Sequence, residues 1–412
     1  MKIGILTYHC VTNFGAQLQT LSTIGYLKKH GHEPIVLNWF PKDLEEFYLR
    51  SHPRDQFDEQ FRFAMEKMPV SNLCRSLDEL SAEIDKLKLD AIFLGSDALF
   101  DYTPERTRYA FSIRQMRRVP QNVDLTSNHL LPNPFWGSFG DCLKKQIPYC
   151  GFSISSQNMP YSKLNKEEKK EMKRLLNRFT SITVRDKWTK ELVRSVSGRK
   201  DVIITPDPVF AFNNNTDFLI KKNELLSKYN LPENYMLISF GKEILSDSFV
   251  NEVIKKIEIE SNVTCVSFPM PRKLTKFNTK KCIELPLPTL DWYYLIKYSQ
   301  GYIGELMHPI IVCLHNSVPF FSFDQYGTFK TIVPRLWSKY LPKSSKIYDI
   351  LGQAGFQSNM CPYICSNKIT TDEVVKRILN FDKKMCSDFA KKQYLRYEKG
   401  MEMSIASLLQ NC

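Results

Sequence analysis

The sequence lacks the long apolar segment that a membrane-spanning helix requires. No apolar run approaches the roughly 20 residues needed to cross a bilayer. The amino terminus, MKIGILTYHCVTNFG, has neither a long apolar core nor a small-residue cleavage site. It is typical of a first β-strand rather than of a signal peptide. From these two absences we expect a cytoplasmic protein.

The sequence also lacks a cysteine framework. Its eleven cysteines are scattered, and several sit in apolar surroundings, as Cys265 does in VTCVSF and Cys313 in IIVCLH. The tightest pair, Cys361 and Cys365, lacks the two-residue gap of zinc and redox motifs, and no second pair matches it. We therefore expect reduced core cysteines and no metal site.

Acidic residues are in deficit, with 44 Asp and Glu against 57 Lys and Arg, which gives a formal net charge of +13. Such an excess can serve nucleic acid, an anionic membrane or phosphorylated small molecules. No helix-turn-helix, zinc-finger or RNA-binding signature is present, so nucleic acid is not an expected partner. The charge suits an enzyme of acidic substrates with peripheral association at the inner face of the membrane.

What is present is an alternation of strands and helices. KIGILTYH is an apolar strand, QLQTLSTIGYLKKHGH has helical periodicity, and EPIVLNWF is a second strand, which together form a parallel βαβ unit. The alternation continues on both sides of the turn-rich FNNNTDF near residues 212–218. We expect two α/β domains with a cleft between them. Residues 1–212 form the first, residues 213–370 the second, and residues 371–412 form helices that pack back across the seam.

Two stretches break the alternation. Residues 41–75 are polar and aromatic, and the pattern there indicates an irregular or helical insertion. Residues 98–146 have poor periodicity and many turn residues. A long irregular stretch in a compact domain is usually a functional loop region, so we expect one there.

Candidate site residues follow the ends of predicted strands. Asn13, Phe14 and Gly15 precede a helix, where free backbone N–H groups favour an anion or a sugar hydroxyl. This loop is neither a P-loop nor a dinucleotide fingerprint, and a plain turn is an equal alternative. Asp97 follows an apolar strand in LGSDALF, where it is either a catalytic or substrate-binding carboxylate or a helix cap.

Arg185 ends the strand of ITVRDKW, and His308 follows the short strand GYIG. A guanidinium at a buried strand end needs a partner, which is either a carboxylate or phosphate of a substrate or a structural acid such as Asp207. His308 stands at the carboxyl end of a strand, where α/β proteins bind their ligands. Its alternative is a cap of the core helix that continues through Pro309, which suits a first helical position.

Together these segments resemble the polysaccharide pyruvyl transferase family. TNFGAQLQTLSTIGYLKKHGHEPIVLNW, LGSDALF, ITVRDKWT, ITPDPVF and ELMHPIIVCLHNSVPFFSF occur in the order of that family's motifs, over roughly residues 2–330. Three positions depart from the family pattern. Leu306 stands where many members have Arg or Ser, Pro309 replaces a small residue, and Ala98 replaces a Gln.

The resemblance implies a GT-B-like glycosyltransferase architecture with two Rossmann-like domains. It also implies transfer of a pyruvyl group from phosphoenolpyruvate to sugar hydroxyls as a cyclic ketal, in the synthesis of cell-surface or capsular polysaccharide. By motif, His308 falls on the family's histidine, Arg185 on its strand-end arginine, and Lys330 near a frequent basic residue. The acceptor is then a sugar or a lipid-linked oligosaccharide.

This chemistry accounts for the residue types. Phosphoenolpyruvate is strongly anionic, so Arg185 and Lys330, with His308, are expected to bind this donor substrate, and no other cofactor is expected. His308 and Asp97 are the expected catalytic residues, because ketal formation requires proton transfers. Asn13, Phe14 and Gly15 are expected on the acceptor side. Two alternatives stay open: a nucleotide-sugar-dependent GT-B glycosyltransferase, and a non-catalytic glycan-binding member of the family.

Overall fold

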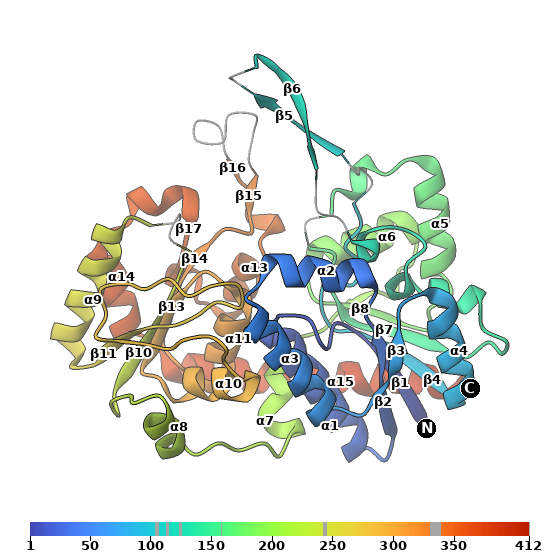
Figure 1. Cartoon of the computed structure of the whole chain (residues 1–412), viewed down its shortest axis with the longest axis horizontal. Coiled ribbons are helices and arrows are strands. Elements are labelled where there is room, and N and C mark those ends of the chain that lie inside the picture. The colour runs from blue at the N-terminus through green and yellow to red at the C-terminus, as the bar shows by residue number, and fades with distance from the viewer. Residues whose placement is uncertain are drawn as a thin grey trace.

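The computed structural model describes residues 1–103, 107–112, 115–122, 126–157, 159–241, 245–329 and 339–411. They form two α/β domains side by side, each built on a parallel sheet (Figure 1). The expected fold class is confirmed. Lys330 lies outside the described residues, so its role in donor binding stays a prediction.

The first domain contains a seven-stranded sheet of order β3-β2-β1-β4-β7-β8-β9. Its strands are β1 (Lys2–Leu6), β2 (Glu33–Trp39), β3 (Val70–Cys74), β4 (Ala91–Leu94), β7 (Tyr149–Ile154), β8 (Ile182–Val184) and β9 (Ile203–Ile204). Its helices are α1 (Phe14–Lys29), α2 (Lys42–Ser51), α3 (Arg54–Lys67), α4 (Leu77–Leu87), α5 (Lys166–Leu176) and α6 (Lys187–Ser197). Every pairing is parallel, and the central strands are buried on both faces, which explains apolar runs such as AIFL.

The second domain contains a six-stranded parallel sheet of order β12-β11-β10-β13-β14-β17. Its strands are β10 (Tyr235–Ser239), β11 (Thr264–Ser267), β12 (Lys281–Cys282), β13 (Gly301–Gly304), β14 (Phe320–Asp324) and β17 (Met360–Pro362). The helices from the end of the first sheet onward are α7 (Phe212–Asn215), α8 (Lys222–Lys228), α9 (Asp247–Ser261), α10 (Thr289–Tyr298), α11 (Met307–Asn316), α13 (Lys346–Ala354) and α14 (Thr371–Leu379).

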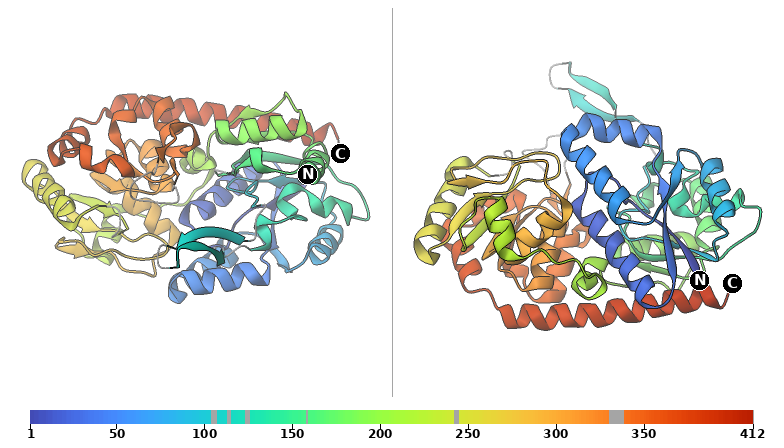
Figure 2. Two further views of the ribbon diagram at one scale, coloured as in Figure 1. Left: turned by 90° about the horizontal axis from the view of Figure 1, so that it is seen from above. Right: turned by 60° about the horizontal axis from the view of Figure 1, so that its bottom comes forward.

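The long final helix α15 (Lys383–Leu409) runs beneath both domains (Figure 2). It contacts β7 of the first sheet and α11 of the second domain. The Tyr397 ring meets Phe152 edge to face at 5.5 Å, and the Cys386 thiol donates to the carbonyl of Leu314. One hydrophobic cluster includes residues of both sheets and of α15, so the domains share a continuous core.

Phe14 and Trp292 join the domains on the cavity side of that core. Phe14, at the start of α1, stacks on Trp292 of α10 with ring centroids 5.0 Å apart. Both rings are almost completely buried. The two halves of the cavity are therefore held together by direct aromatic packing as well as by α15.

The two irregular stretches contain more structure than their sequence pattern indicates. Residues 41–75 form α2, α3 and also strand β3, whose residues SNL are only partly buried because β3 is an edge strand. The sequence pattern did not predict this strand, because the exposed residues of an edge strand need not be apolar. Residues 98–146 include an antiparallel hairpin of β5 (Thr107–Ser112) and β6 (Arg117–Asn122), which projects above the first domain (Figure 1).

Within the described residues, no helix is both long enough and apolar enough to cross a membrane.

Candidate active site

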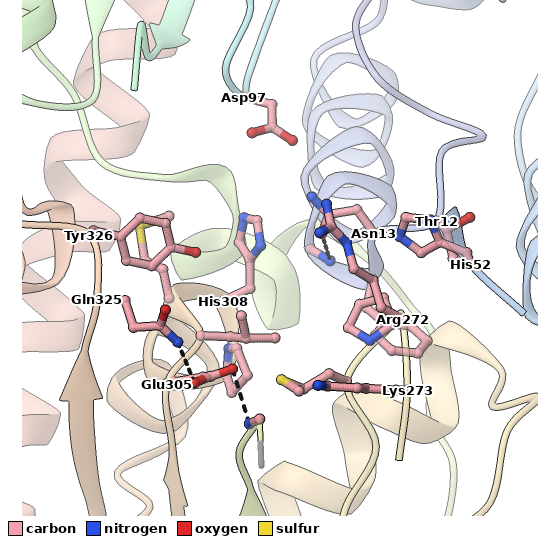
Figure 3. A pocket seen from close by; sticks show the side chains of 18 of the residues that line it. Thr12, Asn13, His52, Asp97, Arg272, Lys273, Glu305, His308, Gln325 and Tyr326 are labelled. Carbon is pink, nitrogen blue, oxygen red and sulfur yellow. Dashed lines mark hydrogen bonds between the residues drawn. The ribbon is translucent and has the colours of Figure 1, made fainter. Parts of the chain in front are cut away.

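A cavity of about 840 Å³ lies between the domains, at the carboxyl ends of both parallel sheets. The first domain contributes Asn13, Asp97 and Arg185 to its wall, and the second contributes His308 and Lys346. The ends of parallel strands meet at one edge of a sheet, and two such edges face each other here. The cavity therefore brings together candidates that are widely separated in the sequence (Figure 3).

His308 lies in the first turn of α11 and points into the cavity (Figure 3). The helix begins at Met307, so Pro309 is its third residue and not its first, as the sequence suggested. Pro is tolerated there because the first four helical N–H groups have no intrahelical partner. Burial lowers the pKa of the His308 imidazole below its usual value, and the nearby Asp207 and Asp97 only partly oppose that shift. Burial therefore favours the neutral form of the ring.

Gly15 supports the His308 ring from the first domain. A Cβ atom built on Gly15 would lie only 2.1 Å from Cγ of His308. The backbone of α1 and the imidazole are thus in direct contact, and only glycine allows it. The sequence predicted Gly15 as an acceptor-site residue. The structure shows that Gly15 lines the cavity and that the His308 ring packs against it.

Gly15→Ala is expected to lower kcat about tenfold to a hundredfold, because the added methyl group must displace the imidazole and small misplacements at a catalytic group are costly. Gly31→Asn is the matched control: Gly31 follows the same helix at φ +74°, which Asn tolerates, and its Cβ position is open. Steady-state kinetics of both variants check this. Wild-type turnover in Gly15→Ala would contradict the contact.

Asn13 and Phe14 have structural roles in addition to their place on the cavity wall. Asn13 is the N-cap of α1, and its Oδ1 accepts the Gly15 N–H at 3.1 Å. The Phe14 ring packs in the interdomain core, as described above. Both line the cavity, which leaves contact with a substrate open for them.

Arg185 is held by two carboxylates. Its Nη1 donates to Oδ2 of Asp207 at 2.7 Å, and its Nη2 lies 3.6 Å from Oδ1 of Asp97. The side chains of Arg185 and Asp207 are 7% and 0% exposed. The structural ion pair that the sequence left open is therefore present, although Arg185 also lines the cavity.

Asp97 has an unusual backbone conformation. Its φ of +110° lies outside the region that residues with a side chain normally adopt. Its Oδ1 accepts the N–H of Ala98 at 2.8 Å, so the carboxylate also braces its own loop. Strained residues of this kind cluster at functional sites, and Asp97 faces the cavity (Figure 3).

Lys346 is a cavity residue that sequence reasoning missed. It is the first residue of α13, whose N-cap Ser345 donates its hydroxyl to the buried carboxylate of Asp324 at the end of β14. Burial, with Arg185 adding to it, lowers the pKa of the Lys346 ammonium to about 8. No hydrogen bond or ion pair to Lys346 is present among the described residues. The sequence signal was slight: a Ser cap before a Lys in KSSKIYD.

Arg272 and Lys273 are two further cations that line the cavity (Figure 3). They lie in the loop after β11, where Met270 and Lys273 pair in a tight turn. Both are exposed and have no carboxylate partner within the part of the chain that the structure describes. Arg272 is near His52, whose pKa is lowered to about 4 mainly by burial and further by this guanidinium.

A comparison with known sequence families identifies the family of this chain. The sequence model of the family described as polysaccharide pyruvyl transferase matches residues 13–325. The chain belongs to the polysaccharide pyruvyl transferase family. This is a family of transferases, and the match spans both domains and includes Asn13, Asp97, Arg185 and His308. Among curated proteins, none matches the sequence.

Solved structures share the fold with little sequence identity. UDP-N-acetylglucosamine 2-epimerase from Rickettsia bellii is 10% identical, with 98% of this chain and 96% of that chain covered and a TM-score of 0.53. An S. aureus MnaA–UDP co-structure is 11% identical, with 98% of this chain and 95% of that chain covered and a TM-score of 0.51. UDP-GlcNAc 2-epimerase from Neisseria meningitidis, bound to UDP-GlcNAc, is 12% identical, with 100% of each chain covered and a TM-score of 0.50. These likenesses confirm the expected GT-B-like architecture.

No group of three or more His, Cys, Asp or Glu side chains placed to hold a metal occurs among the described residues.

Proposed function

We propose that this family member transfers a pyruvyl group from phosphoenolpyruvate to two hydroxyls of a sugar, forming a cyclic ketal of a cell-surface or capsular polysaccharide. The observation that supports this most is a half-buried histidine, His308, in the interdomain cavity beside Lys346, a cation without an ion-pair partner in the part of the chain that the structure describes. A phosphorylated donor needs positive charge at its phosphate, and the reaction needs groups that hold or move protons.

The reaction has a simple balance. The methylene carbon C3 of phosphoenolpyruvate gains one proton, two sugar oxygens form bonds to C2, and the bond from C2 to the phosphate oxygen breaks. Of the two hydroxyl protons released, one balances the proton gained by C3 and the other leaves with phosphate. We assign the proton handling to His308 and Asp97. Asp97 approaches from the first domain, the acceptor side, and His308 from the second, the donor side.

The cations are assigned to the donor. Lys346 lies close enough to Arg185 and His308 for their charges to interact. Arg185 is already paired with Asp207, so Lys346 is the stronger candidate for the donor phosphate. Leu306, where many family members carry Arg or Ser, lines the same cavity as Lys346. The sugar acceptor, on this proposal a free or lipid-linked oligosaccharide, then enters beside Asn13 and Asp97.

The donor can be tested by thermal shift. A ligand that binds only the folded state raises its stability, by about 2.7 kcal/mol at a hundredfold excess over Kd. We expect phosphoenolpyruvate to raise Tm, and Lys346→Ala to abolish that rise. Lys383→Ala is the matched control, because Lys383 also begins a helix but lies in α15, away from the cavity.

The same panel separates the alternatives. The structures that share this fold include one bound to UDP-GlcNAc, so a nucleotide-sugar glycosyltransferase is the main rival. A rise in Tm with UDP- or GDP-sugars alone would overturn the proposed donor. A glycan-binding member without turnover would show no response to phosphoenolpyruvate and no phosphate release with any acceptor.

A further inference from the structure

A chain of buried polar contacts leads from Arg185 to His308 through a residue with no assigned role. Arg185 Nη1 donates to Asp207 Oδ2 at 2.7 Å, and Gln19 Nε2 donates to the same oxygen at 2.6 Å. Gln19 Nε2 also lies 3.5 Å from Nε2 of His308. Gln19 is only 1% exposed and belongs to α1, in the first domain, whereas His308 belongs to the second.

The chemistry of these partners determines which end of the Gln19 amide faces them. A carboxylate paired with a guanidinium is ionised and only accepts hydrogen bonds. The atom of Gln19 next to Asp207 must therefore be its NH2 group and not its oxygen. That group has two hydrogens: one is donated to Asp207 Oδ2, and the other is available to His308.

The orientation of Gln19 in turn determines the tautomer of His308. Two N–H groups cannot face each other at hydrogen-bonding distance, so Nε2 of His308 must present its lone pair to Gln19. The proton of the neutral ring is then on Nδ1. Nδ1 has no hydrogen-bond partner among the described residues, so its N–H is available to a molecule in the cavity. A doubly protonated ring would place a second N–H against the Gln19 amide.

The helix that carries Gln19 also fixes the ring in space. Gly15 lies one turn before Gln19 on the same face of α1 and contacts the imidazole. The ring thus meets a backbone surface at Gly15 and an amide donor at Gln19. Burial also favours the neutral ring, because it lowers the pKa of His308.

We infer that Gln19 is a positioning residue that holds His308 neutral, with its proton on Nδ1 directed to the substrate. This inference rests on the proposed function for what the proton does there. His308 donates a hydrogen bond from Nδ1 to the donor substrate, and Asp97 is the base that accepts a hydroxyl proton. The sequence segment AQLQT gave no sign of this role, because Asp207 and His308 are far away in the chain.

The tautomer can be observed without substrate. In long-range ¹H–¹⁵N spectra of the histidine-labelled full chain, we expect one ring with a protonated Nδ1 and a bare Nε2 at neutral pH. The chain has 7 histidines, and the signal of His308 is the one that His308→Gln removes. Gln19→Leu should convert this signal to the other tautomer or to a mixture. A protonated Nε2 in the wild type, or an unchanged signal in Gln19→Leu, would overturn the inference.

A matched variant separates positioning from stability. Gln17 is equally buried in α1, where its amide donates to the Gln60 carbonyl at 2.6 Å and accepts from the Thr289 hydroxyl, away from His308. Gln17→Leu should lower Tm as Gln19→Leu does but leave the His308 signal unchanged. A change in that signal in Gln17→Leu would show that general loosening of α1 is responsible, and would count against a specific role for Gln19.

Kinetics provide a second readout. Gln19→Leu should lower kcat about tenfold or more through misplacement of the ring. Its acidic pH limb should also move upward, because the amide no longer opposes protonation of Nε2. The groups whose charges act on His308 are Asp207, Asp97 and Arg185 from the first domain and Lys346 from α13, and all are unchanged in this variant. If phosphoenolpyruvate is not the donor but the tautomer is as expected, the proposed function fails and the inference on Gln19 stands.

Discussion

Replacing His308 with glutamine is expected to lower kcat by about a hundredfold or more, the usual contribution of a group that assists proton transfer. Glutamine keeps the size and polarity of the side chain, so the fold and much of the donor binding should remain. The measurement is steady-state release of phosphate from phosphoenolpyruvate with a sugar acceptor. Thermal unfolding of the same variant checks the fold.

The pKa of His308 determines in which direction the turnover rate should change with pH. The pKa of His308 is lowered from 6.5, chiefly by burial, so the ring gains a proton only below that value. The wild-type rate should therefore fall as pH decreases through the lowered pKa of His308. A separate loss on the basic side is expected near pH 8, where Lys346 gives up its proton. His308→Gln should lack this acidic limb, because glutamine does not titrate.

His315 provides the control within the same helix. It lies two turns further along α11, where its Nε2 accepts the N–H of Asn213, and burial lowers its pKa to about 3. His315→Gln should keep the turnover and the acidic limb of the wild type. Retained turnover in His308→Gln, with an unchanged pH profile, would return His308 to the role of a residue that merely starts a helix.

The sequence predicted the elements that depend on local pattern. Strands such as KIGIL and AIFL are continuous apolar runs because both faces of a parallel sheet are covered, and periodicity detects such runs. Asp97, Arg185 and His308 were predicted because each follows a strand, and the structure places all three on the wall of one cavity. These three predictions needed only the chain order and the rule on where α/β proteins bind ligands.

The residues that were missed depend on contacts between segments that are far apart in the sequence. Lys346 enters the cavity because its helix is anchored to Asp324, and no local pattern connects the two. Gln19 occupies an ordinary helical position until Asp207 and His308 are brought to it. Arg185 illustrates the same limit, because the sequence offered a substrate anion and Asp207 equally, and only the folded structure shows that Asp207 is a partner.

Arg185→Leu is expected to lower the free energy of unfolding by about 3–5 kcal/mol, the usual cost of removing one member of a buried ion pair. The reason is that Asp207, whose side chain is fully buried, would lose its charge partner. Asp97 would lose the same guanidinium at 3.6 Å. Thermal or denaturant unfolding measures the loss. Arg174 is the control, since it also pairs with an aspartate, Asp141, at 2.7 Å but on the surface, with both side chains 45% exposed. Arg174→Leu should cost about 1 kcal/mol or less.

A double variant then asks whether Arg185 also binds the donor. Arg185→Leu with Asp207→Asn removes both charges of the pair, so much of the lost stability should return, because no uncompensated carboxylate stays buried at position 207. If Arg185 only balances Asp207, the double variant should bind phosphoenolpyruvate nearly as the wild type does. If the guanidinium also grips the donor, affinity should stay low although stability has recovered. A loss in Arg185→Leu no larger than that in Arg174→Leu would contradict the buried pair itself. The comparison therefore separates the two roles that the sequence left open for Arg185, because one is measured as stability and the other as affinity.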